Sequence, residues 1–193
     1  MFLWSVLILI TAYLIGAFPS AYIIGSYYGV NLRNMGDGNL GARNTYQVLG
    51  WKPALMVGFL DLGKGAFATW LATLLLDSRV MHYLAGLAAI LGHDFSIYIH
   101  FAGGQGMAAN LGSLIVLQPR ETLLGIAIAL LALLLFRNWD FAWVLGLGGV
   151  VALSYIYDRP LWQLVMVALM FVSIGFKKLI DLPLAHSLHH RNP

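Results

Sequence analysis

The sequence has no cysteine among its 193 residues, which excludes disulfide bonds and any chemistry that needs a thiol. Charged residues are also scarce, because they make up 10% of the chain whereas about 25% is usual for a soluble domain. The formal net charge is only +3 and no dense basic run is present, so nucleic acid is not an expected partner. Since 60% of the residues are hydrophobic, we expect an all-α integral membrane protein with a single domain over residues 1–193.

Apolar runs divide the chain into segments with the lengths of membrane helices, which need about 20 residues to cross a bilayer. We expect about seven transmembrane helices, some short or broken, at residues 2–24, 53–76, 80–91, 107–117, 122–136, 141–157 and 161–176. Pro19 predicts a kink in the first helix. The first segment lacks the basic start and cleavage site of a signal peptide, so we expect it to stay as a helix. Residues 25–52 are expected to form a polar loop, and the residues from Lys177 onward a solvated tail.

Lysine and arginine are distributed unevenly between the two sides of such a bundle. With the N-terminus outside, the cytoplasmic segments hold seven of them, namely Arg33, Arg43, Lys52, Arg137, Lys177, Lys178 and Arg191. The opposite side holds three, namely Arg79, Arg120 and Arg159. Basic residues are in excess in cytoplasmic loops. The sequence therefore predicts an N-terminus outside the cell and a C-terminus in the cytoplasm.

The most conspicuous polar segment runs from Arg33 to Asn44. It contains three closely spaced glycines, Gly36, Gly38 and Gly41. Glycine lets the backbone approach a ligand closely, and successive free N–H groups can surround an anion. Arg43 would pair with a phosphate, while the amides of Asn39 and Asn44 would orient hydroxyl groups. The alternative is a solvated turn between helices, but such turns seldom need three glycines in six residues.

A second glycine-rich segment follows about sixty residues later. It consists of Gly103, Gly104, Gln105 and Gly106. A helix that begins directly after it would attract an anion to its N-terminus. The alternative is a re-entrant turn, which a membrane permits only where it is lined by protein or water. With the N-terminus outside, both glycine-rich segments lie on the cytoplasmic face, where we expect them to meet and form one site.

Asp61 and Lys64 lie three residues apart within the second apolar run, on one face of the expected helix. Ionisable residues inside a membrane usually face the bundle interior and indicate function, and a structural ion pair is the alternative. His93 follows the third apolar run, where its imidazole would suit a base for a hydroxyl nucleophile. Its alternative role is a structural hydrogen bond. The histidines of the tail have no spacing typical of metal ligands, so we expect no metal site.

At these residues the chain resembles the bacterial membrane acyl-phosphate:glycerol-3-phosphate acyltransferases, the PlsY family. Three segments carry the resemblance in order and at matching intervals, at residues 36–44, 60–65 and 92–108. They are similar to the family patterns Gly-Ser-Gly-Asn-x-Gly-Ala-Thr-Asn, Asp-x-x-Lys-Gly and Gly-His…Gly-Gly-Lys-Gly-x-Ala. The likeness covers residues 10–117 well and is mostly hydrophobic pattern beyond them.

The resemblance implies transfer of an acyl chain from acyl phosphate to the 1-hydroxyl of glycerol 3-phosphate. The product would be lysophosphatidic acid for phospholipid synthesis, and neither coenzyme A nor another cofactor would be needed. The family also implies seven helices in the bacterial plasma membrane and an active site that faces the cytoplasm. Membrane lipids and the soluble enzyme that supplies acyl phosphate would be the partners.

Carried onto this chain, the resemblance places substrate contacts at Gly36, Gly38, Asn39, Gly41, Arg43, Asn44, Asp61, Lys64, Gly103, Gly104, Gln105 and Gly106. Asp37 or His93 would contact the attacking hydroxyl. The chain also departs from the family patterns, since Asp37 replaces a serine, Arg43 a threonine and Gln105 a lysine. These departures leave two alternatives open. One is an acyltransferase with a less anionic acceptor, and the other is a non-catalytic lipid-binding paralogue.

Overall fold

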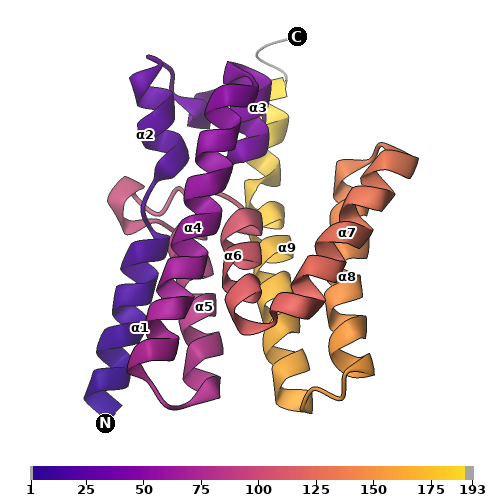
Figure 1. Cartoon of the computed structure of the whole chain (residues 1–193). Helices are drawn as coiled ribbons and strands as arrows, with labels where there is room; N and C mark the ends of the chain where they lie inside the picture. The colour runs from indigo at the N-terminus through magenta and orange to yellow at the C-terminus, as the bar shows by residue number, and fades with distance from the viewer. Residues whose placement is uncertain (1, 190–193) are drawn as a thin grey trace.

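The structure, a computed structural model, describes residues 2–189, and the regular structure of this part of the chain is helical throughout (Figure 1). The elements are α1 (Phe2–Gly16), α2 (Ser20–Tyr27), η1 (Leu32–Asn34), α3 (Ala42–Leu49), α4 (Trp51–Leu75), α5 (Arg79–Asp94), η2 (Ile97–Ile99), α6 (Met107–Leu117), α7 (Pro119–Phe136), α8 (Trp139–Ile156) and α9 (Leu161–His189). Within residues 2–189, six spans are long and apolar enough to cross a membrane, and α6 is a shorter apolar helix of 11 residues. The prediction of an all-α membrane protein with some helices short or broken is confirmed.

The first span consists of α1 and α2, which are separated at Pro19 as expected. Proline has no N–H to donate and its ring clashes with the preceding helical turn, so the helix opens just before it. The opening makes two backbone carbonyls accessible to side chains from other parts of the bundle. Ala17 O accepts a hydrogen bond from Ser96 Oγ at 2.5 Å, and Phe18 O accepts one from Lys64 Nζ at 2.7 Å. The kink therefore connects the first span to α4 and to the segment that follows α5.

Helix α4 packs against α1, α5 and α6, and glycines allow the close contacts in this part of the bundle. A Cβ added at Gly65 would overlap the backbone of Ala109 on α6, and one added at Gly16 would overlap Ala89, which brings α1 against α5. Small residues at helix contacts are typical of membrane bundles, because they let backbones approach. This packing places one face of α4, with Asp61 and Lys64, in the interior.

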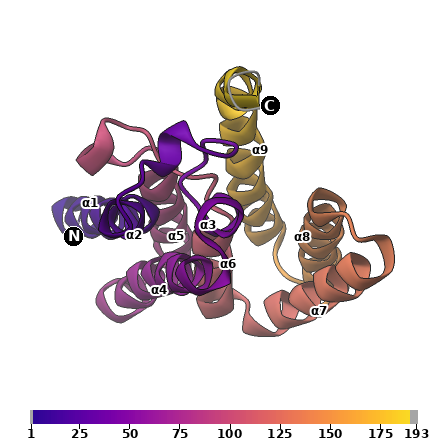
Figure 2. The same ribbon diagram turned by 90° about the horizontal axis from the view of Figure 1, so that it is seen from above.

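Helices α7 and α8 pack mainly against each other and form a pair at one side of the bundle (Figure 2). Helix α6 rises about 16 Å at 1.5 Å per residue, about half of a 30 Å hydrocarbon core. Because α6 is short, its connection to α7 lies nearer the middle of the molecule than the α4–α5 and α8–α9 connections (Figure 1).

The expected loop over residues 25–52 is not a loop throughout, because α3 occupies Ala42–Leu49. Its inward face carries Asn44 and Thr45, which are fully buried, while Arg43 is exposed. The prediction was wrong because the polar side chains on the inward face of α3 are hydrogen-bonded within the protein. Asn44 donates to two carbonyls of the preceding turn, and Thr45 Oγ1 donates to Gly41 O at 2.9 Å.

The expectation of a solvated tail after Phe176 is also wrong, because α9 continues to His189. Lys177 and Asp181 are both buried, and Lys177 Nζ donates to Asp181 Oδ2 at 2.6 Å. Pairing within one helix face allows these charged residues to stay inside the bundle. Arg191, one of the basic residues in the charge count, lies outside the described residues.

Candidate functional site

A cavity of about 90 Å³ lies between the two glycine-rich segments, at the end of the bundle that carries α2 and α3 (Figure 1). Its lining residues are Asn39, Gly41, Ala42, Arg43, Asp61, His93, Gln105, Gly106, Met107, Ala108, Trp139 and Trp143. The two segments therefore meet, as the sequence predicted, together with the charged face of α4 and the end of α5. We call this space the polar cavity.

Asn44 holds the first glycine-rich segment in shape. Its Nδ2 donates to Leu32 O at 2.9 Å and to Met35 O at 3.0 Å, while its Oδ1 accepts from Asp37 N at 3.0 Å. A Cβ at Gly36 would overlap this Oδ1, so only glycine fits beside the amide. Both N–H groups of the Asn44 amide are thus used inside the protein, and its contact with substrate stays a prediction.

Asp37 is not among the residues that line the polar cavity. Its Oδ1 accepts a hydrogen bond from Asn39 N at 3.0 Å, which is the pattern of an Asx turn. Gly38, between them, has a φ of 72°, a region that glycine adopts without steric cost. The Asp37 carboxylate therefore stabilises the turn that presents Asn39 to the cavity, and its contact with an attacking hydroxyl stays a prediction.

The first segment is also connected to α9. Arg33 Nη1 donates to Gly38 O at 3.2 Å, and Arg33 Nη2 lies 3.3 Å from Asp181 Oδ1. A Cβ at Gly38 would lie 2.9 Å from Leu188 Cδ1, so α9 packs closely against this turn. The last helix thus helps to fix the geometry of the polar cavity.

Asp61, Lys64 and His93 form a buried cluster at the wall of the polar cavity, with side chains that are at most 7% exposed. Asp61 Oδ1 lies 2.9 Å from Lys64 Nζ and 3.5 Å from His93 Nδ1. A buried ion pair needs further hydrogen bonds to offset desolvation, and the Phe18 carbonyl supplies one for Lys64. The Asp61 carboxylate lies on the Nδ1 side of the His93 imidazole, close enough to stabilise a positive charge on the ring.

The second glycine-rich segment wraps closely around His93. Gly104 N donates to His93 O at 3.1 Å, and a Cβ at Gly104 would overlap His93 Nε2. Gly106 has a φ of 67° and precedes the first turn of α6. The first N–H groups of a helix lack partners within it, and Met107 and Ala108 line the polar cavity. This end of α6 therefore suits an anion, which favours the binding interpretation of the segment.

Four residues at the cavity rim were missed by the sequence interpretation, which assigned Arg137–Asp140 to a turn and Lys178 to the tail. The four are Trp139, Asp140, Trp143 and Lys178. Asp140 Oδ1 lies 3.3 Å from Arg43 Nη1 and 2.9 Å from Lys178 Nζ. Two cations thus share one carboxylate, which leaves a net positive charge at the rim. The sequence pattern that could have indicated them is the pair Trp139 and Trp143, which lie four residues apart at the start of α8.

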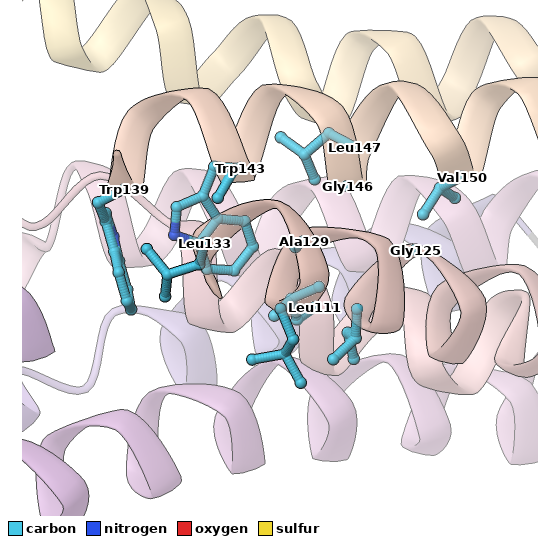
Figure 3. Close-up of a pocket in the computed structure, with 12 residues that line it drawn as sticks. Leu111, Gly125, Ala129, Leu133, Trp139, Trp143, Gly146, Leu147 and Val150 are labelled. Carbon is cyan, nitrogen blue, oxygen red and sulfur yellow. The ribbon is translucent and has the colours of Figure 1, made fainter. Parts of the chain in front are cut away.

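A second cavity of about 180 Å³ adjoins the polar one and lies between α6, α7 and α8 (Figure 3). We call it the apolar cavity, because each of its lining residues is hydrophobic or glycine: Leu111, Gly125, Ile126, Ala129, Leu130, Leu133, Trp139, Ala142, Trp143, Gly146, Leu147 and Val150. Trp139 and Trp143 line both cavities. A molecule with an anionic head and a hydrocarbon chain could therefore occupy the two together.

Comparison with known proteins gives a consistent assignment. The family model for glycerol-3-phosphate acyltransferase matches residues 6–182. A glycerol-3-phosphate acyltransferase from Thermus thermophilus is 38% identical over 171 residues, which cover 89% of this chain and 84% of the relative. Glycerol-3-phosphate acyltransferase 2 from Moorella thermoacetica is 38% identical over 167 residues, which cover 83% and 82%.

The fold is likewise similar to solved structures of PlsY, an integral membrane glycerol 3-phosphate acyltransferase. For the glycerol 3-phosphate form, the TM-score is 0.84 at 29% identity, over 93% of this chain and 90% of that one. For the lysophosphatidic acid form, the TM-score is 0.81 at 28% identity, over 90% and 87%. The chain therefore belongs to the glycerol-3-phosphate acyltransferase family.

Proposed function

We propose that the protein transfers an acyl chain from acyl phosphate to the 1-hydroxyl of glycerol 3-phosphate and releases lysophosphatidic acid. Membership of the family supports the acceptor and the class of reaction. The observation that carries the proposal is the pair of cavities that share Trp139 and Trp143. The polar cavity would hold the phosphate and the reacting carbonyl group, and the apolar cavity would hold the start of the hydrocarbon chain.

In this reaction the 1-hydroxyl oxygen attacks the carbonyl carbon of the acyl phosphate. A carbon–oxygen ester bond forms, the bond from that carbon to the phosphate oxygen breaks, and inorganic phosphate leaves. The hydroxyl proton must pass to a base. His93 fits this role better than Asp37, because His93 lines the polar cavity and has the Asp61 carboxylate 3.5 Å from its Nδ1. The Asp61 carboxylate would also stabilise the protonated imidazole.

The phosphate groups would be held by Arg43, by the N-terminal N–H groups of α6 and by the amide of Gln105. Arg43 can offer a guanidinium fork to a phosphate if the substrate displaces Asp140. That exchange is inexpensive, because the Arg43 and Asp140 side chains are 43% and 48% exposed and a solvated ion pair is worth at most about 1 kcal/mol.

We further propose that the polar cavity faces the cytoplasm of a bacterial plasma membrane, with the N-terminus outside. The uneven distribution of basic residues supports this orientation. In the structure, Arg33, Arg43 and Lys178 lie at the polar-cavity end, whereas Arg79 and Arg159 line a separate recess at the far end (Figure 1). A soluble enzyme that makes acyl phosphate could then deliver it directly to the site.

The assay that tests the proposal uses the purified protein with acyl phosphate and glycerol 3-phosphate, beside a known family member. We expect lysophosphatidic acid and inorganic phosphate in equal amounts. The absence of product while the family member is active would exclude this reaction. Product from acyl-coenzyme A but not from acyl phosphate would be consistent with glycerol 3-phosphate as the acceptor and would contradict acyl phosphate as the donor.

The alternative of a less anionic acceptor rests on Gln105, which stands where the family pattern has lysine. We expect Gln105→Lys to lower the KM for glycerol 3-phosphate by about tenfold or more, because a hydrogen bond to a charged group is worth about 1.5–3 kcal/mol. Asn34→Lys is the matched control, since it adds the same charge at an exposed position outside the polar cavity. A higher KM in Gln105→Lys would indicate that the site is specialised for another acceptor.

The role of the apolar cavity can be tested at Leu147, which lines it on α8 (Figure 3). We expect Leu147→Trp to fill part of the cavity and to lower kcat/KM for a 16-carbon acyl phosphate relative to an 8-carbon one by about tenfold, the effect of about 1.4 kcal/mol. Leu145→Trp makes the same change on the same helix at a residue that does not line the cavity. Equal chain-length profiles for the two variants would place the acyl chain elsewhere.

A further inference from the structure

A second polar recess lies at the opposite end of the bundle from the glycine-rich segments. It has a volume of about 280 Å³ and is bounded by the α4–α5 connection, by the α8–α9 connection and by the end of α6. The short α6 creates this space, because its connection to α7 lies nearer the middle of the molecule than the neighbouring connections (Figure 1). None of the residues assigned to the polar cavity lines this recess.

The ionisable side chains in the recess are basic or neutral. Arg79, His82, Tyr83 and Arg159 line it, and no Asp or Glu is among its described lining residues. Arg79 is exposed and makes no hydrogen bond or ion pair with another described residue. Arg159 Nε donates to Oε1 of the fully buried Glu121 at 2.7 Å. This contact raises the pKa of Arg159 and fixes the side chain, and its two terminal nitrogens have no partner within residues 2–189.

A buried network orients a further donor toward the same space. Gln118 Nε2 donates to Tyr83 Oη at 2.8 Å, and Tyr83 Oη donates to Gln163 Oε1 at 3.3 Å. Ser154 Oγ lies 2.6 Å from Gln118 Oε1 and 2.8 Å from Val150 O, so it connects this network to α8. Gln163 is 3% exposed and lines the recess. Because its carbonyl oxygen is used by Tyr83, its N–H groups remain as donors and bond to no other described residue.

We propose that this recess is a binding site for a phosphate group, distinct from the active site. Two guanidinium groups and an oriented amide supply donors, and planar guanidinium forks match phosphate oxygens. Glu121 balances one of the two arginine charges, which leaves one positive charge for a singly charged phosphodiester. Asp77 and Asp158 lie in the neighbouring turns, but both are exposed and do not line the recess. At this end of the membrane spans, the ligand is either a phospholipid headgroup of the adjacent leaflet or free phosphate.

Arg79→Gln tests the site without leaving a buried charge unpaired, because Arg79 is exposed and has no partner among the described residues. Arg120→Gln is the matched control. Arg120 is an arginine near the same end that stacks on the ring of Tyr157 at 4.0 Å and does not line the recess. The full chain in detergent is titrated with short-chain phosphatidylglycerol, with phosphatidylcholine of equal chain length and with inorganic phosphate. Bound lipid is counted by native mass spectrometry, and Tm is followed in parallel.

We expect phosphatidylglycerol to bind the wild-type protein and Arg120→Gln equally, and Arg79→Gln about tenfold more weakly, as expected for loss of a charged hydrogen bond. Arg79-dependent stabilisation by inorganic phosphate alone would support the site and identify free phosphate as the ligand. Phosphate bound in the active site does not confound the comparison, because that binding is the same in both arginine variants. Equal affinities of the two variants for all three probes would overturn the proposal.

Discussion

Asp61→Asn is expected to lower the free energy of unfolding by about 3–5 kcal/mol, the cost of removing one partner from a buried ion pair. The substitution leaves Lys64, whose side chain is 7% exposed, with only the Phe18 carbonyl as a partner. It also removes the carboxylate that lies 3.5 Å from His93 Nδ1. The measurement is the midpoint of thermal unfolding in detergent, with unfolding monitored as the loss of the helical circular-dichroism signal.

The double variant Asp61→Asn with Lys64→Met separates the charge effect from the loss of contacts. With both charges removed no unpaired ion remains, so we expect the double variant to be more stable than Asp61→Asn alone. Asp140→Asn serves as the control for an ion pair in water. Its carboxylate is 48% exposed, so the expected change is at most about 1 kcal/mol. If Asp61→Asn and Asp140→Asn lost the same stability, the interior ion pair would not hold the bundle together.

The sequence predicted those parts of the fold that depend on local composition. The apolar runs identified every long helix, since a membrane span must be apolar over its own length. Pro19 predicted the break in the first span, because proline acts on its own helical turn. The partners of the carbonyls that this break makes accessible could not be predicted. Lys64 and Ser96 reach them from distant parts of the chain, and only the packed bundle brings these side chains together.

The polar residues of α9 show why the site was only partly predictable. In sequence, Lys177 and Asp181 are typical of a solvated tail, since charged residues are seldom buried without partners. They are buried because they pair with each other and because Arg33 reaches Asp181 across the bundle. The glycine-rich segments were recognisable from their unusual composition alone. The role of Trp139 and Trp143, which line both cavities, could not be recognised in the same way. It depends on the side of α8 that faces the glycine-rich segments in the folded bundle.

His93→Gln is expected to lower kcat for acyl transfer by about 10²–10⁴-fold, the usual contribution of a general base. Glutamine is similar in size and can accept a hydrogen bond, but it cannot take up a proton near neutral pH. The expected change in KM for either substrate is small, because the phosphate contacts assigned to Arg43 and to α6 are unaltered. The measurement is steady-state kinetics with acyl phosphate and glycerol 3-phosphate between pH 5 and pH 9.

Two further variants decide whether this loss reflects chemistry or structure. His82→Gln makes the same change on the same helix, at a residue outside the polar cavity, and should keep wild-type kcat. Asp37→Asn tests the other candidate for contact with the hydroxyl. If His93 is the base, only His93→Gln loses the limb of the pH profile that reports ionisation of the base, and Asp37→Asn changes kcat by less than about tenfold. A large loss in Asp37→Asn together with a normal pH profile in His93→Gln would transfer the role to Asp37. In that case the histidine would be a structural partner of Asp61.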